Sequence, residues 1–197
     1  MGPLAIAGDR LWTFASAANA PAQQAAIQRD LVALVPKGQS QPPAVAEQEA
    51  DAWTQHVPAA LRKAVAQVLP GWTVLDGQAD AKTGIQAQWQ GEKNVLVTLA
   101  SDGRPMYLAR RLAVPGGKPR LLVRVGHDAP NKGKLQVEIG GKTVWEQPIG
   151  QATAAGWKSW EADLSAYAGQ TVCVVVSQIG DGKSEMYTRW GRLEVVR

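Results

Sequence analysis

The sequence is poor in the residues on which metal and thiol chemistry depend. It contains one cysteine and two histidines in 197 residues. The lone Cys173 excludes an intrachain disulfide, and with His56 and His127 far apart it cannot give the ligand spacing of a zinc site. We therefore expect no metal site, and we expect Cys173, inside an apolar run, to be a buried structural residue.

The common enzyme motifs are also missing. The chain has no Gly-x-Ser-x-Gly, no Gly-x-x-x-x-Gly-Lys-Ser/Thr and no His-Glu-x-x-His. We expect no catalytic residue, no cofactor and no enzymatic activity. Two alternatives stay open: a pair of carboxylates brought together across a cleft, and a structural calcium ion held by aspartates at turns. Those aspartates are Asp76, Asp80, Asp102, Asp128, Asp163 and Asp181.

Long apolar runs are absent, so we expect no membrane insertion. The first residues lack a basic stretch followed by a long apolar one, which excludes a signal peptide within them. Met1-Gly2-Pro3 favours an added start, so we expect a piece of a larger protein. The net charge of +4 lies in residues 71–197, spread along the chain rather than in a patch with aromatics, and we expect no nucleic-acid partner.

Residues 1–70 are rich in alanine and glutamine and show helical spacing. In one stretch the apolar stripe is formed by Ala26, Ile27, Leu31, Leu34 and Val35. About four short helices are expected: one capped by Asp9 through Leu11, Trp12 and Phe14, then residues 21–35, 44–55 and 58–68. Helices this short are marginal alone, so we expect them to pack on each other and on the rest of the chain.

From residue 71 the apolar period changes to alternation, and turn signals recur about every 8–12 residues. This pattern predicts a second domain over residues 71–197, an antiparallel β-sandwich, and the lack of crossover helices argues against a βαβ fold. Strands are expected at residues 72–75, 83–89, 95–99, 106–114, 120–125, 134–139, 142–147, 157–163, 171–178 and 185–196. The fold class is therefore mainly β.

Gly140-Gly141 is the clearest turn signal, because glycine pairs favour two-residue primed hairpins. A regular hairpin pairs Val137 with Val144 and Gln136 with Trp145. Trp145 then points away from the core side of its sheet.

Several segments from about Tyr107 onward match a known domain. They are Leu-Leu-Val-Arg-Val-Gly-His-Asp at residues 121–128, the hairpin at 135–142, residues 156–172, which include Asp-Leu-Ser-Ala-Tyr-Ala-Gly-Gln-Thr-Val, and residues 185–195. This part resembles the galactose-binding-like (discoidin or jelly-roll) β-sandwich found at the ends of large exported proteins of planctomycete-type bacteria. The resemblance implies a jelly-roll fold and binding, often of carbohydrate. The loop at 129–134 departs from the family's Gly-Asp-Trp turn.

Eight tryptophans are many for this length, and tryptophan serves both cores and sugar-binding surfaces. By strand parity Trp89 and Trp160 belong in the core. Trp145, Trp157 and Trp190 are the candidate ligand platforms. Trp157 begins its strand beside a loop, and Trp190 shares the parity of charged neighbours unless Gly191 introduces a bulge.

His127 and Asp128 end a strong strand and begin a loop. We take them as candidate contacts for sugar hydroxyls, with a polar turn in which Asp128 bonds local backbone as the alternative.

The sequence thus favours a non-catalytic carbohydrate-binding module of a larger, extracytoplasmic bacterial protein. The alternative is a structural or protein-interaction domain in which the same aromatic residues dock a neighbouring domain. Exposed, coplanar rings beside a groove would favour the first, and rings buried under residues 1–70 the second.

Overall fold

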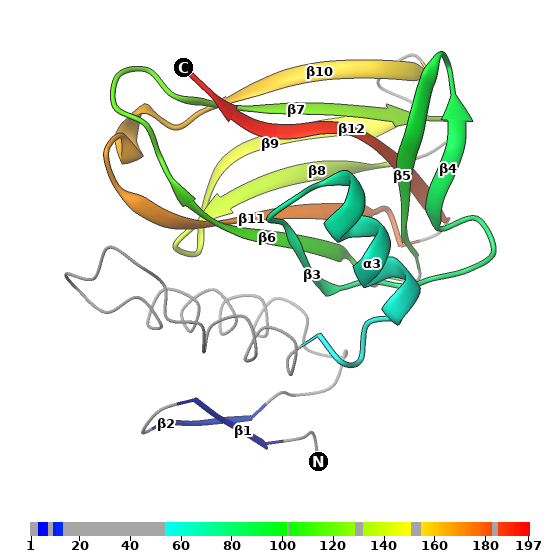
Figure 1. The fold of residues 1–197 in the computed structure, drawn as a ribbon, viewed down its shortest axis with the longest axis horizontal. Helices are drawn as coiled ribbons and strands as arrows, with labels where there is room; N and C mark the ends of the chain where they lie inside the picture. The colour runs from blue at the N-terminus through cyan, green and yellow to red at the C-terminus, as the bar shows by residue number, and fades with distance from the viewer. Residues whose placement is uncertain are drawn as a thin grey trace.

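The computed structural model describes the backbone of residues 4–7 and 10–13, and then residues 54–101, 103–128, 132–150, 155–182 and 185–197. In the described residues from 54 onward the chain forms two stacked sheets with one α-helix, α3 (Ala59–Val68), before them (Figure 1). The predicted mainly-β class is confirmed.

Each of the two large sheets has five strands, in the orders β10-β7-β12-β5-β4 and β3-β6-β11-β8-β9. The strands of the first sheet are β4 (Gly84–Trp89), β5 (Glu92–Ala100), β7 (Arg120–His127), β10 (Gly156–Asp163) and β12 (Met186–Val196). The strands of the second are β3 (Thr73–Asp76), β6 (Met106–Ala113), β8 (Lys132–Ile139), β9 (Lys142–Gly150) and β11 (Thr171–Gly180). All neighbours in the two sheets are antiparallel.

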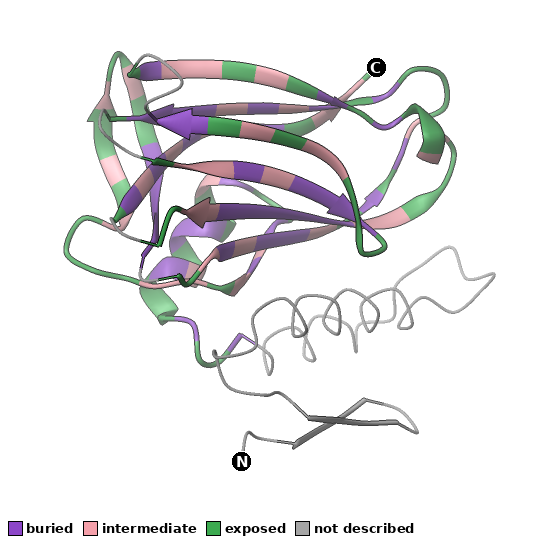
Figure 2. Ribbon diagram, turned by 180° about the vertical axis from the view of Figure 1, so that it is seen from behind, coloured by how far each residue is buried: buried purple, intermediate pink, exposed green. Residues whose placement is uncertain are grey.

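Every predicted strand from residue 72 onward overlaps one of these ten strands. In several of them, apolar residues alternate with polar ones because one face of the strand is buried. In β7, Leu121, Val123 and Val125 are fully buried between the sheets, whereas Arg120 and Arg124 face outward. Figure 2 shows this change between buried and exposed residues along the strands. The expected primed turn at Gly140-Gly141 is also present, with φ of 59° and 78°.

The two open sides of the sandwich are closed differently. On one side α3 packs against β3, β4 and β5 and adds Leu61, Ala64 and Val65 to the shared core. On the other side Trp145 of β9 and Trp160 of β10 meet with ring centroids 6.2 Å apart. Aromatic contact at this edge joins the two sheets where their backbones do not pair.

A buried polar link also joins the sheets. Gln178 of β11 is fully buried, and its Nε2 donates to the Met186 carbonyl of β12 at 2.6 Å. Its Oε1 accepts a hydrogen bond from Thr98 of β5. Trp190 in turn donates its indole N–H to Thr98 Oγ1 at 2.8 Å. These bonds fix how the sheets stack, since a buried polar group without a partner is costly.

The predicted first helix, through residues 11–14, is wrong. Residues 4–7 and 10–13 form instead a two-stranded antiparallel sheet of β1 (Leu4–Ala7) and β2 (Arg10–Thr13). A helix of so few residues is marginal alone, whereas the hairpin gives both segments backbone partners.

The predicted helix at 58–68 is confirmed as α3. The helix predicted at 21–35, and the one at 44–55 as far as residue 53, lie outside the described residues, and the domain boundary at 70/71 stays a prediction. None of the helices within the described ranges is long and apolar enough to cross a membrane.

Candidate functional site

Trp190 lies inside the sandwich, so the prediction that it faces outward is wrong. Its side chain is fully buried. The cause is a bulge at Gly191, because the ladder between β12 and β7 shifts register between Trp190 and Arg192. The alternation changes by one residue there, and Trp190 belongs to the core rather than to a ligand surface.

Trp145 faces the interior for a similar reason. Ile139 pairs with Lys142 as expected, but the register shifts between Val137 and Glu138. Trp145 therefore lies opposite Val137, which is fully buried, and packs half-buried against the core. The predicted outward orientation of Trp145 is wrong, because its side chain packs against the core between the two sheets.

The two polar candidates differ in burial. His127 is fully buried at the end of β7, so its ring cannot reach a ligand at the surface, contrary to the prediction. Asp128 is exposed, and its Oδ2 accepts a hydrogen bond from Arg189 Nη1 at 2.7 Å. Asp128 stays a candidate through this arginine.

Trp157 lies on the outer face of the first sheet, where the β4–β5 hairpin folds over it. In Figure 1, β4 and β5 run across the directions of β7, β10 and β12. Trp157 pairs with Gly126 of β7. Gly126 follows the buried Val125, so this position of the strand faces away from the core. The hairpin's Gln90 Oε1 lies 3.1 Å from where a Cβ on Gly156 would stand. The tip of the hairpin thus covers this part of the sheet.

Two glycines allow the tryptophans to lie close to the sheet. A Cβ on Gly126 would lie 2.1 Å from Cζ3 of Trp89, and a Cβ on Gly191 would lie 2.9 Å from Cζ3 of Trp157. Any side chain at position 126 would displace the Trp89 ring, so the ring can lie against the sheet only because residue 126 is a glycine.

The prediction that Trp89 is a core residue is therefore wrong. Trp89 is half-buried, and it lies against the outward-facing Gly126 rather than among the core residues. Gln90 and Asn94 have φ of 43° and 54°, and these left-handed residues interrupt regular alternation in the hairpin.

The two rings and two arginines form one stack, which we call the arginine–tryptophan ladder: Arg124, Trp157, Trp89 and Arg189. The Trp89 and Trp157 centroids are 4.9 Å apart with planes at 77°. Arg189 Cζ lies 4.6 Å from the Trp89 centroid, and Arg124 Cζ lies 5.1 Å from that of Trp157. These distances suit edge-to-face aromatic and cation–π contacts.

Acceptors surround the ladder. Glu92 Oε1 accepts from Arg124 Nη2 at 2.5 Å, and Gln86 Oε1 accepts from Arg189 Nε at 3.0 Å. Each arginine is thus paired with a carboxylate, Glu92 or Asp128, and the site holds no excess charge. It can offer a ligand indole surface together with hydrogen-bond donors and acceptors.

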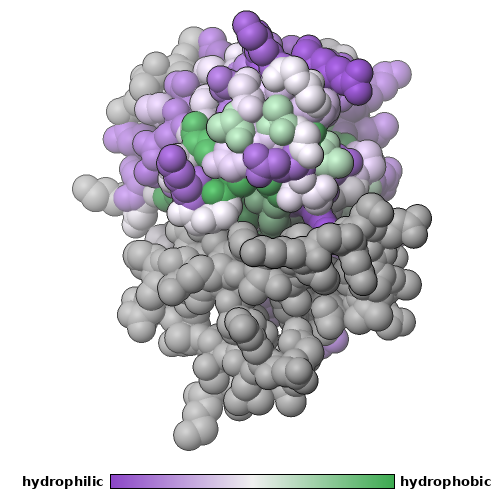
Figure 3. Space-filling model, turned by 90° about the vertical axis from the view of Figure 1, so that its left-hand side faces the viewer, coloured by the Kyte–Doolittle hydropathy of each residue, from purple (hydrophilic) through white to green (hydrophobic). Residues whose placement is uncertain are grey.

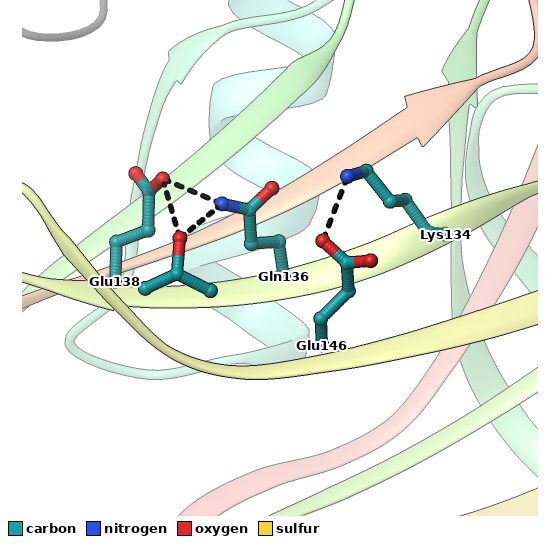
Figure 4. A network of polar contacts seen from close by, with 5 residues as sticks. Lys134, Gln136, Glu138 and Glu146 are labelled. Atoms are coloured by element: carbon teal, nitrogen blue, oxygen red, sulfur yellow. Dashed lines mark hydrogen bonds and ion pairs between the residues drawn. The ribbon is translucent and has the colours of Figure 1, made fainter.

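Another polar network lies on the outer face of the β8–β9 hairpin (Figure 4). Lys134 Nζ donates to Glu146 Oε2 at 2.7 Å, and Gln136 Nε2 donates to both Glu138 Oε1 and Thr143 Oγ1. These cross-strand contacts stabilise the hairpin, since facing polar side chains are the unit of sheet pairing.

A cluster of acids lies around Tyr187. Its Oη is 2.5 Å from Asp80 Oδ2 and 2.9 Å from Glu185 Oε2. Burial and these two carboxylates raise the pKa of Tyr187. Burial by itself would raise the pKa of Asp80. Hydrogen bonds from Tyr187 and from the backbone N–H groups of Lys82 and Thr83 outweigh it, so the pKa of Asp80 is lowered. Asp80 is thus committed to protein donors. Within the described ranges no three acids, histidines or cysteines are grouped to hold a metal.

The end of the sandwich with the β6–β7 connection and the 3₁₀ helix η2 (Ser165–Tyr167) is a further surface (Figure 3). Hydrophobic residues gather in its middle, with hydrophilic ones around them. Tyr167, Val172 and Val195 are half-buried there and pack against the core. The apolar residues on this surface are thus the partly exposed edge of the hydrophobic core.

The sequence prediction missed four residues of the site: Trp89, Glu92, Arg124 and Arg189. One signal could have found the place. Glycines inside strands often mark a close approach, and Gly126 and Gly191 are both the seats of tryptophans.

The architecture is an antiparallel β-sandwich of two five-stranded sheets. Solved structures with a similar arrangement include the K3 adhesin domain of Lys-gingipain from Porphyromonas gingivalis, with 12% identity, TM-score 0.49, and coverage of 66% of this chain and 92% of that one. A CBM4 structure has 11% identity, TM-score 0.46, and coverage of 67% and 98%. TmCBM61, solved with β-1,4-galactotriose, has 17% identity, TM-score 0.46, and coverage of 66% and 90%.

No family model matches the sequence. No curated protein matches it either. Identities of 11–17% concern architecture alone and assign no ligand to this chain.

Proposed function

We propose that this chain is a non-catalytic binding module that takes carbohydrate at the arginine–tryptophan ladder. The observation that carries the proposal is the pair of half-buried rings, Trp89 and Trp157, set on an outer sheet face among polar groups. Indole surface packs against the C–H faces of a sugar, and the surrounding amide, guanidinium and carboxylate groups bond its hydroxyls.

The angle between the rings limits the shape of the ligand. Planes at 77° form a corner, not a flat platform. A sugar residue or a bent chain fits such a corner, whereas a flat crystalline polysaccharide surface needs coplanar rings. We therefore expect soluble glycans to bind, with weak affinity for each sugar residue. We also propose that the module belongs to a larger exported bacterial protein, lies outside the cytoplasm and needs no cofactor.

A glycan array followed by calorimetric titration with soluble polysaccharides tests the proposal. Trp157→Ala should weaken binding about two- to tenfold, because stacking on one ring contributes about 0.5–1.5 kcal/mol. Trp145→Ala is the matched control, since Trp145 is also half-buried but faces the interior. Both variants need a native far-UV spectrum. Absence of any binding at millimolar sugar would refute the proposal.

One observation favours a structural or protein-interaction domain instead. Each ring of the ladder has an arginine over it, so Arg124 and Arg189 already use aromatic surface that a sugar would stack on. In that case the ladder holds the hairpin to the sheet. Trp157→Ala would then lower the unfolding midpoint and leave no glycan affinity to lose.

A further inference from the structure

The contact between Glu92 and Arg124 bears on which sugars the ladder takes, and it rests on the proposed function. Glu92 is the first residue of β5, directly after the Gln90-Gly91 turn. Its carboxylate lies over the sheet, because Oε2 is 3.1 Å from where a Cβ on Gly191 would stand. Glu92 and Arg124 are 36% and 37% exposed, so the pair is open to solvent on one side.

The pairing uses one arm of the guanidinium fork. Glu92 accepts from Arg124 Nη2, while Arg124 Nε is buried and has no hydrogen-bond partner among the described residues. The buried Nε1 of Trp157 has none among them either, and its ring lies beside the same guanidinium. Buried donors left unpaired cost about 1–3 kcal/mol each. Two N–H groups on neighbouring side chains therefore favour an additional acceptor oxygen.

The β4–β5 hairpin sets the position of Glu92. Gln90 and Gly91 form the two-residue turn between the paired residues Trp89 and Glu92, with φ of 43° and 87°. Positive φ at both positions is the geometry of a primed hairpin turn. The turn therefore places Glu92 opposite Trp89, beside the ladder.

We propose that Glu92 occupies the place of a ligand carboxylate, and that the ladder prefers acidic sugars. A uronic acid has a planar carboxylate that fits both Nε and Nη2 of an arginine, whereas a sugar hydroxyl fits one donor at a time. The ligand carboxylate displaces Glu92 from Arg124, and the sugar ring packs beside Trp157. The intramolecular carboxylate then competes with the ligand and weakens binding in the native chain.

The test compares oligosaccharides of galacturonic and glucuronic acid with their neutral counterparts of equal length, titrated by calorimetry into the full chain. Wild type should bind the acidic series more tightly. Glu92→Gln should raise the affinity for the acidic oligosaccharides about tenfold, which corresponds to about 1.4 kcal/mol. The affinity for the neutral oligosaccharides should stay within about twofold of wild type. Arg124→Lys keeps the charge but loses the fork, and it should lower acidic affinity at least tenfold.

The matched control is Glu161→Gln. Glu161 pairs with Arg120 on the same outer face, away from the ladder, so its removal alters net charge equally. It should leave both series unchanged, and an equal gain from Glu161→Gln would overturn the proposal as a general charge effect. Equal binding of both series, with Trp157→Ala still harmful, would overturn the acidic preference and keep the binding function. Binding of neither series would overturn both.

Discussion

A methyl group added at Gly126 tests whether Trp89 is seated on the sheet as described. The Cβ of Gly126→Ala would stand 2.1 Å from Cζ3 and 2.6 Å from Cη2 of Trp89. Contacts this short cannot persist, so the rigid ring must rise from the sheet. It would then lose its cation–π contact with Arg189, worth about 0.5–1 kcal/mol. It would also lose its edge contact with Trp157, worth about 0.5–1.5 kcal/mol.

We therefore expect Gly126→Ala to lower the free energy of unfolding by about 1–2.5 kcal/mol, the sum of the two contacts. The measurement is urea unfolding followed by far-UV circular dichroism. Gly116→Ala is the control, because a Cβ there meets no atom within 4 Å. In a Trp89→Ala background the Gly126→Ala change should cost under about 0.5 kcal/mol, since the obstructing ring is gone. An equal loss of stability in both backgrounds would show that Trp89 does not lie against Gly126.

Three further outcomes follow from the described contacts. Gln178→Leu should destabilise the fold by about 2–4 kcal/mol in urea, because it leaves the Met186 carbonyl and Thr98 without their partner, and the exposed Gln88→Leu should change little. Trp145→Ala should cost about 2–3 kcal/mol by opening the β9–β10 side, and Trp145→Phe should restore part of it; no loss would contradict the closing role. Burial raises the pKa of Cys173 from near 9.0 to about 11, although the residue is half-buried and not fully enclosed as predicted. The unfolded thiol ionises first as pH rises, so this group's contribution favours folding below pH 9.0 and declines toward about 11. Native-state alkylation at pH 8 should be slow, and a rate equal to that of the unfolded chain would contradict the shift.

The strand pattern shows why the architecture could be predicted and the side-chain directions could not. Alternation or a short apolar run between turn signals marked the ten strands from residue 72 onward, and Gly140-Gly141 marked a two-residue hairpin, because these signals depend on local chemistry. The directions of Trp145 and Trp190 depended on two bulges. A bulge changes which face every later residue takes, and it is set by how two strands pair, which neither strand records alone.

The candidate site shows the same division. Trp157 and Asp128 were predicted from their places at strand ends, and the structure brings them to one outer surface. Their partners Trp89, Arg124 and Arg189 come from three strands far apart in sequence. Only the crossing of the β4–β5 hairpin over the sheet brings those side chains together.

By itself the sequence determined the class of fold, the strands and the primed turn, because each follows from residue type and short-range spacing. The tertiary structure decided which tryptophans face outward, how the sandwich sides are closed, and that two arginines stack on two indoles. These features arise from contacts between residues such as Trp89 and Gly126, whose closeness is set by the curvature of the sheet and by the absence of a side chain on a distant strand.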